Sequence, residues 1–166
     1  MTRLAFLTLL LASPAFAQDN AILVHMTRDL GKPEKALRAA YAACIAGNGQ
    51  VEATAQPFTE NGWTRSDDTE MGLITLTPAE GDLYVTLAAD GTFCDVASES
   101  QGTDAALSSI QILSGAAGLP VEMLETGSEC LAASIGMGMV EITSSGNDPV
   151  CLSESTSAAR FFFTPS

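Results

Sequence analysis

Residues 83–96, LYVTLAADGTFCDV, decide the fold because they place two strand-like runs on either side of a turn. Both flanking runs are rich in β-branched and aromatic residues, which favour strands. Asp90-Gly91 between them favours a type I′ hairpin turn, in which both central residues take positive φ. The stretch therefore predicts an antiparallel hairpin with Cys94 on its returning strand.

Other stretches continue this antiparallel pattern. Strands are predicted at 73–76, 83–87, 93–96, 130–135, 139–143, 150–152 and 160–163. Residues 66–70 predict an acidic loop, residues 145–148 a turn, and residues 121–129 fit no single element. Phe161-Phe162-Phe163 makes both faces of the last strand apolar, which predicts a central strand. Because hairpins dominate over strand–helix–strand units, the pattern favours an α+β fold over a doubly wound parallel sheet.

Two or three helices are predicted to pack on this antiparallel sheet. The first opens at Pro33, a favoured residue in a first helical turn, and ends at the Gly-Asn-Gly sequence of residues 47–49. One face of this helix carries Leu37, Tyr41 and Cys44. Residues 50–62 predict a second, weaker helix that Pro57 breaks or restarts. Residues 22–24 are expected to form a brief strand or to pack as an arm.

The clearest helix starts at Thr103. This threonine is a favourable N-cap, and Asp104 suits the positive end of the helix dipole. The apolar stripe of the helix is formed by Ala106, Ile110, Leu113 and Ala117. Gly118, followed by Pro120, ends the helix.

A short pattern of a strand-like triplet, a glycine and a cysteine occurs twice. It is formed by Val85-Thr86-Leu87, Gly91 and Cys94, and again by Val140-Glu141-Ile142, Gly146 and Cys151. The spacing from valine to glycine is six in both copies, and the spacing from glycine to cysteine differs by two. Because a helix precedes each hairpin, the chain would contain two weakly similar helix-plus-hairpin units, at 33–100 and 101–166.

Residues 1–17 have the build of a secretory signal peptide. Arg3 is followed by an apolar run at residues 4–11, and Ala15-Phe16-Ala17 provides small residues for cleavage before Gln18. The apolar run is far shorter than the roughly 20 residues that span a bilayer, and no later segment is apolar enough to do so. We expect a periplasmic or secreted protein with an N-terminal arm at 18–32, a single disulfide-stapled domain at 33–166, and no transmembrane segment in the mature chain.

The four cysteines are Cys44, Cys94, Cys130 and Cys151. An even number in an exported chain predicts two disulfides. No CxxC sequence occurs, so a thioredoxin-type redox pair or a zinc ribbon has no support. Of the three ways to pair four cysteines, we prefer Cys44–Cys94 with Cys130–Cys151, because each predicted unit would then close its own disulfide.

The composition is strongly acidic. The whole chain has a net charge of −13, and the leader contains one charged residue, Arg3, so the mature chain has a net charge of −14. Nucleic-acid binding requires clustered Lys and Arg to neutralise phosphates, and an anionic membrane would repel such a chain, so both are disfavoured. An acidic surface instead favours solubility and attraction to a basic protein or peptide.

No catalytic set can be assembled from the sequence. His25 is the single histidine and lies near the mature N-terminus, and no hydrolase, zinc-protease or nucleotide-binding motif is present. Asp67, Asp68 and Glu70 offer some oxygen ligands for Ca²⁺, but they lack the EF-hand pattern and its glycine. We assign no catalytic, cofactor-binding or metal-ligating residue and no cofactor.

These observations favour a non-enzymatic exported accessory or inhibitor-like binding protein with an acidic surface. A small carboxylate-dependent hydrolase is the alternative from another class, and it predicts a concave pocket that holds two acids with raised pKa. A structural component of an envelope or secretion assembly is the third hypothesis. It predicts a long exposed strand edge or an exposed apolar face at Phe161–Phe163.

Overall fold

A computed structural model of the chain describes residues 15–127, 130–136, 138–145 and 150–163, with side chains from residue 21 onward. The helices are α1 (Ala15–Met26), the short 3₁₀ helix η1 (Thr27–Asp29), α2 (Pro33–Gly47), α3 (Val51–Glu60) and α4 (Thr103–Ala116). The strands are β1 (Thr64–Asp68), β2 (Leu73–Thr77), β3 (Leu83–Ala88), β4 (Phe93–Ser98), β5 (Val121–Met123), β6 (Leu131–Ile135), β7 (Gly138–Thr143) and β8 (Ser157–Phe162). The α+β prediction is confirmed.

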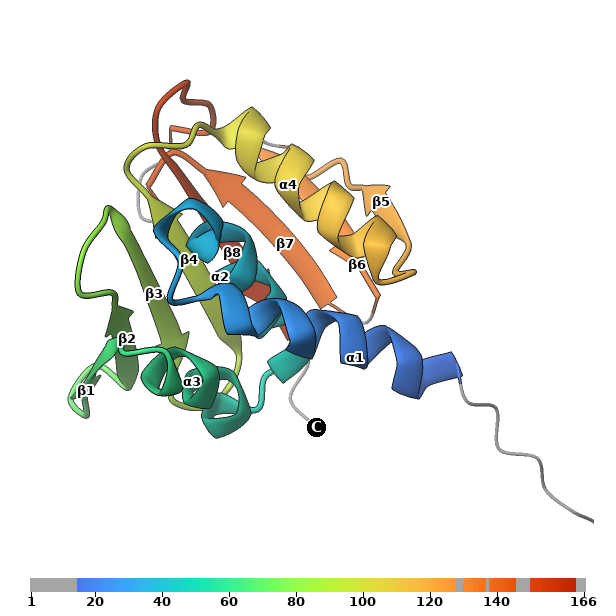
Figure 1. The fold of residues 1–166 in the computed structure, drawn as a ribbon. Coiled ribbons are helices and arrows are strands. Elements are labelled where there is room, and N and C mark those ends of the chain that lie inside the picture. The colour runs from blue at the N-terminus through green and yellow to red at the C-terminus, as the bar shows by residue number, and fades with distance from the viewer. Residues whose placement is uncertain (1–14, 128–129, 137, 146–149, 164–166) are drawn as a thin grey trace, which may run out of the picture.

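The described strands form a single antiparallel sheet, and the helices pack on one of its faces (Figure 1). The strand order is β1-β2-β3-β4-β8-β7-β6-β5. Each half of the chain therefore contributes four consecutive strands, and the last strand of each half lies at the centre. This places β8 between β4 and β7, as the Phe161–Phe163 pattern predicted for a central strand. The sequence similarity between the two halves stays a prediction.

The structure adds one helix that the sequence did not predict. Residues 22–24 belong to α1, not to a strand, and Leu23 of this helix is buried against the core. The helix predicted at residues 50–62 is α3, which runs through Pro57 without the predicted break. The prediction of two or three helices was therefore low by at least one, because short apolar runs do not distinguish a strand from a buried helix.

Several other local predictions were wrong. The predicted acidic loop at 66–70 is largely strand, since residues 64–68 form β1 and pair with β2. Residues 150–152 are not a strand. The N-cap of α4 is Gly102, because the Thr103 hydroxyl donates to the Ser153 carbonyl oxygen at 3.3 Å instead of capping the helix. Most of the turn predicted at 145–148 lies outside the described residues.

The β3–β4 hairpin is present, but its turn is not of type I′. A type I′ turn needs positive φ at both central residues. Gly91 has positive φ (78°), but Asp90 does not, since Asn48 is the one non-glycine residue with positive φ among those that the structure describes. The Asp90 carboxylate accepts hydrogen bonds from the Thr92 backbone N–H at 3.0 Å and from the Thr92 hydroxyl at 2.7 Å. Asp90 thus stabilises the turn with its side chain while keeping negative φ, as aspartate does in Asx turns.

The core lies between the sheet and the helices. The predicted stripe of α4 is buried, with Ala106, Ile110, Leu113 and Ala117 all at most 1% exposed. Tyr41 of α2 packs its ring 5.8 Å from that of Phe161. Trp63 is buried, and its ring contacts that of Phe58 edge-on, with 4.9 Å between the ring centres. Its indole N–H donates to the Leu30 carbonyl oxygen at 3.1 Å.

Two disulfides are present, as predicted, and they join Cys44 to Cys94 and Cys130 to Cys151. This is the pairing that the sequence favoured. Cys44 and Cys94 are fully buried, so the first bond ties α2 to the central strand β4 inside the core. The second bond lies among the connections of the other half, where it joins the start of β6 to the segment between β7 and β8.

The turn after α2 packs backbone to backbone against the β3–β4 turn. A Cβ on Gly91 would lie 2.1 Å from the Gly49 carbonyl oxygen, and a Cβ on Gly49 would lie 2.8 Å from the Gly91 carbonyl oxygen. Both residues also have φ of 78°, a conformation that favours glycine. The end of α2 is therefore held on the end of the central hairpin by a contact that leaves no room for side chains.

We expect the two disulfides to differ in their contribution to stability. In the chain-entropy model, the 50-residue separation of Cys44 and Cys94 corresponds to about 4 kcal/mol and the 21-residue separation of Cys130 and Cys151 to about 3 kcal/mol. Cys44→Ala/Cys94→Ala should therefore lower the free energy of unfolding more than Cys130→Ala/Cys151→Ala does. Urea unfolding followed by the fluorescence of Trp63 measures both, and a larger loss for the second pair would contradict this ranking.

Gly91→Ala should destabilise the protein more than Gly72→Ala. Both glycines have positive φ, so each substitution carries a similar backbone cost of about 1–2 kcal/mol. A Cβ on Gly72 meets no atom within 4 Å, whereas a Cβ on Gly91 clashes with Gly49. The difference between the two variants in urea unfolding isolates the contact, and we expect about 1–3 kcal/mol. Equal losses would show that the two turns separate without cost.

Candidate functional site

A pocket of about 450 Å³ lies at the end of the sheet where the ends of the helices meet. Its walls come from both halves of the chain: from α1, the end of α2, the segment after α4, the β6–β7 hairpin and the end of β8. Side chains that line it include Leu23, Ile45, Ala46, Leu119, Met139 and Phe163. Pockets of about 300–1,000 Å³ are typical of small-ligand sites.

Three chain reversals make this pocket. Asn48 ends α2 in the left-handed conformation, with φ of 45° and ψ of 51°. Gly118 (φ 70°) follows α4, and Gly136 (φ 58°) begins the β6–β7 turn. Because two of the three reversals use glycine, they provide backbone but no side chain to fill the space between them. The hollow therefore follows from how the chain turns at this end of the sheet.

The lining of the pocket is chemically simple. Among the residues that the structure describes, no ionisable side chain contributes to it, and Asn48 provides the single polar side chain. An ion would be desolvated there without a partner, which is costly, whereas an apolar group gains from leaving water. The pocket therefore suits an uncharged apolar group, with the Asn48 amide as an available hydrogen-bonding group at the wall.

The opposite face of the sheet carries a charged row at its centre. Cys94 faces α2, so its neighbour Asp95 points to the face without helices. Asp95 lies directly opposite Arg160, which lies opposite Glu141 on β7. Asp95 is 5% exposed, and its Oδ1 lies 3.3 Å from Nε of Arg160. The Arg160 guanidinium also lies 5.1 Å from the centre of the Phe93 ring, a cation–π distance.

Burial raises the pKa of the Asp95 carboxyl, and the Arg160 guanidinium opposes that rise. Asp95 lines none of four well-formed pockets found among the described residues. Three of these pockets contain a pair of acids: Asp29 with Glu34, Asp104 with Glu154, and Glu80 with Asp82. Lys32 and Lys35 lower the pKa of Asp29, which is the opposite of what a carboxylate-dependent hydrolase requires. The hydrolase hypothesis therefore gains no support from these pockets.

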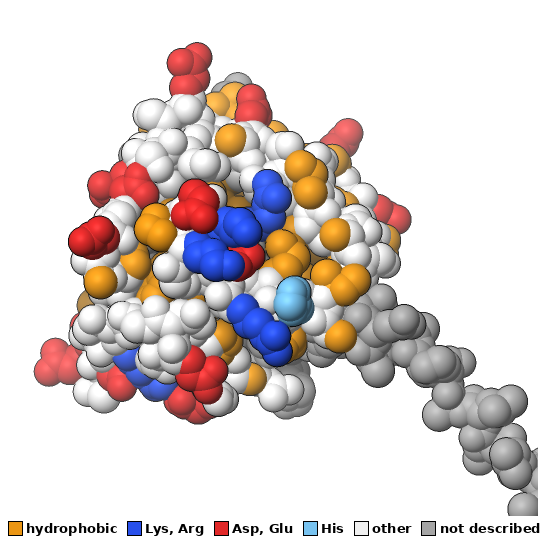
Figure 2. Space-filling view, in the orientation of Figure 1, with side chains coloured by type: hydrophobic (Ala, Val, Ile, Leu, Met, Phe, Trp, Pro, Cys, Tyr) orange, Lys and Arg blue, Asp and Glu red, His pale blue; other side chains and the backbone are white. Residues whose placement is uncertain are grey.

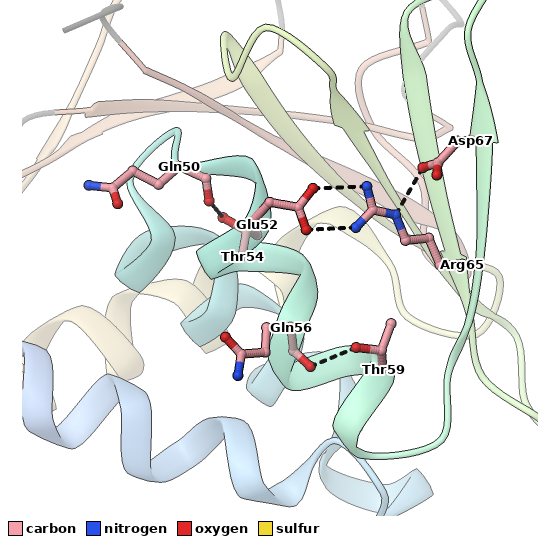
Figure 3. Close-up of polar contacts among 7 residues, drawn as sticks. All are labelled: Gln50, Glu52, Thr54, Gln56, Thr59, Arg65 and Asp67. Carbon is pink, nitrogen blue, oxygen red and sulfur yellow. Dashed lines mark hydrogen bonds and ion pairs between the residues drawn. The ribbon is translucent and has the colours of Figure 1, made fainter.

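Two of the three acidic side chains at 67–70, those of Asp67 and Asp68, accept hydrogen bonds from protein groups, and Figure 3 shows the contact of Asp67. The Arg65 guanidinium donates to both carboxylate oxygens of Glu52, at 2.9 and 3.0 Å, and to Asp67 at 2.9 Å. Asp68 Oδ1 accepts hydrogen bonds from the backbone N–H groups of Glu70 and Met71. Among the residues that the structure describes, no group of three or more His, Cys, Asp or Glu side chains could hold a metal ion. Arg65 instead fastens α3 to β1.

The remaining candidates for chemistry are dispersed. His25 is exposed on α1, and the four cysteines are all in disulfides.

Comparison with known proteins gave no match to a family model, a curated protein or a solved structure. Within the described part of the chain, no helix has the length and apolar character needed to cross a membrane. The apolar pocket is therefore the feature on which a functional argument can be built, and no sequence motif pointed to it.

Asp95→Asn should reveal the raised pKa as a pH-dependent difference in stability. An acid whose pKa is higher in the folded state stabilises that state when protonated, and this contribution is lost as pH rises through the folded pKa. The unfolding free energy of the wild type relative to Asp95→Asn should therefore fall as pH rises above the ordinary value of 3.8, and then level off. Urea titrations across this range test it, and a difference independent of pH would contradict it.

Proposed function

We propose that this chain is a non-enzymatic exported binding protein that holds an uncharged apolar group in the pocket between its two halves. The observation that carries the proposal is the pocket of about 450 Å³, whose lining contains no ionisable side chain among the described residues. Apolar walls provide the driving force for such a ligand, and a single polar side chain can orient it. Acyl chains and apolar side chains of peptides are ligands of this chemistry.

Export is supported by two independent features. Residues 1–17 have the composition of a signal peptide, and both disulfides belong to the kind of framework that persists in an oxidising compartment. The periplasm is the compartment that we propose. The acidic surface of the mature chain also supports a basic protein or peptide as its partner there.

A structural role in an envelope assembly is less well supported. That hypothesis predicted an exposed apolar face at Phe161–Phe163, but Phe161 is buried at 3% exposure in a strand paired on both sides. The described edges of the sheet are β1, which carries three charged residues, and β5, which has three residues. Short or charged edges of this kind discourage strand addition.

Filling the pocket should abolish binding of an apolar probe. We expect the neutral fluorophore N-phenyl-1-naphthylamine to bind saturably to the folded wild type, because it is uncharged and apolar. Ala46 is partly exposed at the pocket wall, so Ala46→Phe places a ring in the cavity and should weaken binding at least about tenfold. Fluorescence titration measures the dissociation constant.

Ala53→Phe is the matched control. Ala53 is exposed on α3 and lines none of the four pockets, so the same substitution there should leave binding unchanged. Urea unfolding of both variants verifies that each remains folded under the titration conditions. Absence of saturable binding to the wild type, or equal binding by wild type and Ala46→Phe, would overturn the proposed function.

A further inference from the structure

The positive charges of this acidic protein are concentrated in one place. The mature chain has six Lys and Arg residues, and four of them lie within residues 28–38. We refer to Arg28, Lys32, Lys35 and Arg38 as the cationic face; all four side chains are exposed. Figure 2 shows most of the visible blue side chains gathered over the middle of the helical side of the molecule, with red side chains among them and further red side chains around the rim.

The two basic residues outside the cationic face have structural partners. Arg65 is paired with Glu52 and Asp67, and Arg160 is paired with Asp95. Within the cationic face, Lys32 and Lys35 share Asp29. No acid lies within ion-pair distance of Arg28 or Arg38 among the residues that the structure describes. These two guanidinium groups are therefore available to an external anion.

Exposed aliphatic side chains adjoin the cationic face. Ile22 and Val24 on α1 are 44% and 54% exposed, while Leu23 between them is 2% exposed and anchors the helix to the core. Val24 lies near the end of α1, and Arg28 follows in η1. The aliphatic side chains come from α1, whereas the basic ones come from η1, α2 and the segment between them. Aliphatic side chains beside Lys and Arg are the combination that binds the interfacial region of an anionic bilayer.

The negative net charge does not oppose such docking at close range. At physiological ionic strength the Debye length is about 8 Å, so charges farther away are largely screened. A helix layer about 10 Å thick separates the sheet, and the acids on its far face, from a surface that contacts α1 and α2. Asp29 and Glu34 are the acids of residues 28–38, the segment that contains the cationic face, so this segment has a net charge of +2. Local charge therefore governs the contact between the cationic face and an anionic surface, although the net charge of the whole chain disfavoured such a contact.

We propose that the cationic face, together with Ile22 and Val24, docks the mature protein on the surface of an anionic lipid bilayer. The docking helix α1 is also a wall of the apolar pocket, to which it contributes Leu23. A bilayer is a source of apolar acyl groups, which favours it over an acidic protein as the occupant of this face. The docking does not depend on whether the pocket is filled.

The test is flotation of the exported, leader-cleaved protein with lipid vesicles. At low salt the protein should float with vesicles of phosphatidylcholine containing about one third phosphatidylglycerol, and not with vesicles of phosphatidylcholine alone. Binding should decrease as salt rises. Arg28→Gln/Arg38→Gln should weaken binding at least about tenfold, and neither substitution breaks an ion pair among the described residues.

Two controls separate local charge from net charge. Ser66→Glu/Thr77→Glu changes the net charge by the same amount, at exposed positions on the face of the sheet without helices, and should leave binding nearly unchanged. Ile22→Ser/Val24→Ser should weaken binding, whereas Ile112→Ser, at an equally exposed position on α4, should not. All variants are compared at equal vesicle concentration, after urea unfolding has verified that each one is folded under the flotation conditions.

Three results of the flotation experiments would overturn the docking proposal. They are the absence of flotation with the anionic vesicles, equal flotation with both kinds of vesicle, and an equal loss for the glutamate control. Binding to soluble polyglutamate without flotation would assign the face to an acidic protein and would also overturn it. Ala46→Phe should keep vesicle binding, and Arg28→Gln/Arg38→Gln should keep binding of the naphthylamine probe, so failure of docking and failure of the pocket are distinguishable.

Discussion

The attachment of α2 to β4 is the constraint on which the rest of the structure depends. The buried Cys44–Cys94 bond joins the helix to the central strand, and Tyr41 one turn earlier packs on Phe161 of the neighbouring strand β8. The helix thus spans the junction between the two halves of the sheet. Because its end is also fixed by the contact between Gly49 and Gly91, the position of Asn48 and of the adjacent pocket wall is determined.

The sequence predicted those parts of the fold that local patterns encode. The two strand-like runs around a turn at 83–96, the stripe of α4 and the even number of cysteines each reflect a single physical rule, and each prediction was correct in its main point. The errors arose where tertiary contacts override propensity. Residues 66–70 look like a loop because they are polar and acidic, yet pairing with β2 and the Arg65–Glu52 contact make residues 64–68 a strand.

The pocket could not be predicted for a different physical reason. Its walls come from five segments that are distant in sequence, and its volume is the space that three chain reversals leave unfilled. A hollow of this kind has no periodicity and no motif, since the residues that line it are mostly common apolar residues and glycines. The cationic face is an intermediate case: the cluster at 28–38 is visible in the sequence, but net charge obscures it until the fold places these residues on one side.

Helix α1 connects the predicted leader to both proposed sites. It begins at Ala15, and cleavage after Ala17 would leave Gln18 to Met26, so the mature chain would start within the helix. Leu23 remains nine-tenths or more buried and keeps the helix attached, while Ile22 and Val24 stay on its exposed surface. An isolated helix of this length is marginal in water, so α1 depends on its packing against α2. A bilayer that contacts α1 would therefore lie beside one wall of the pocket, to which α1 contributes Leu23.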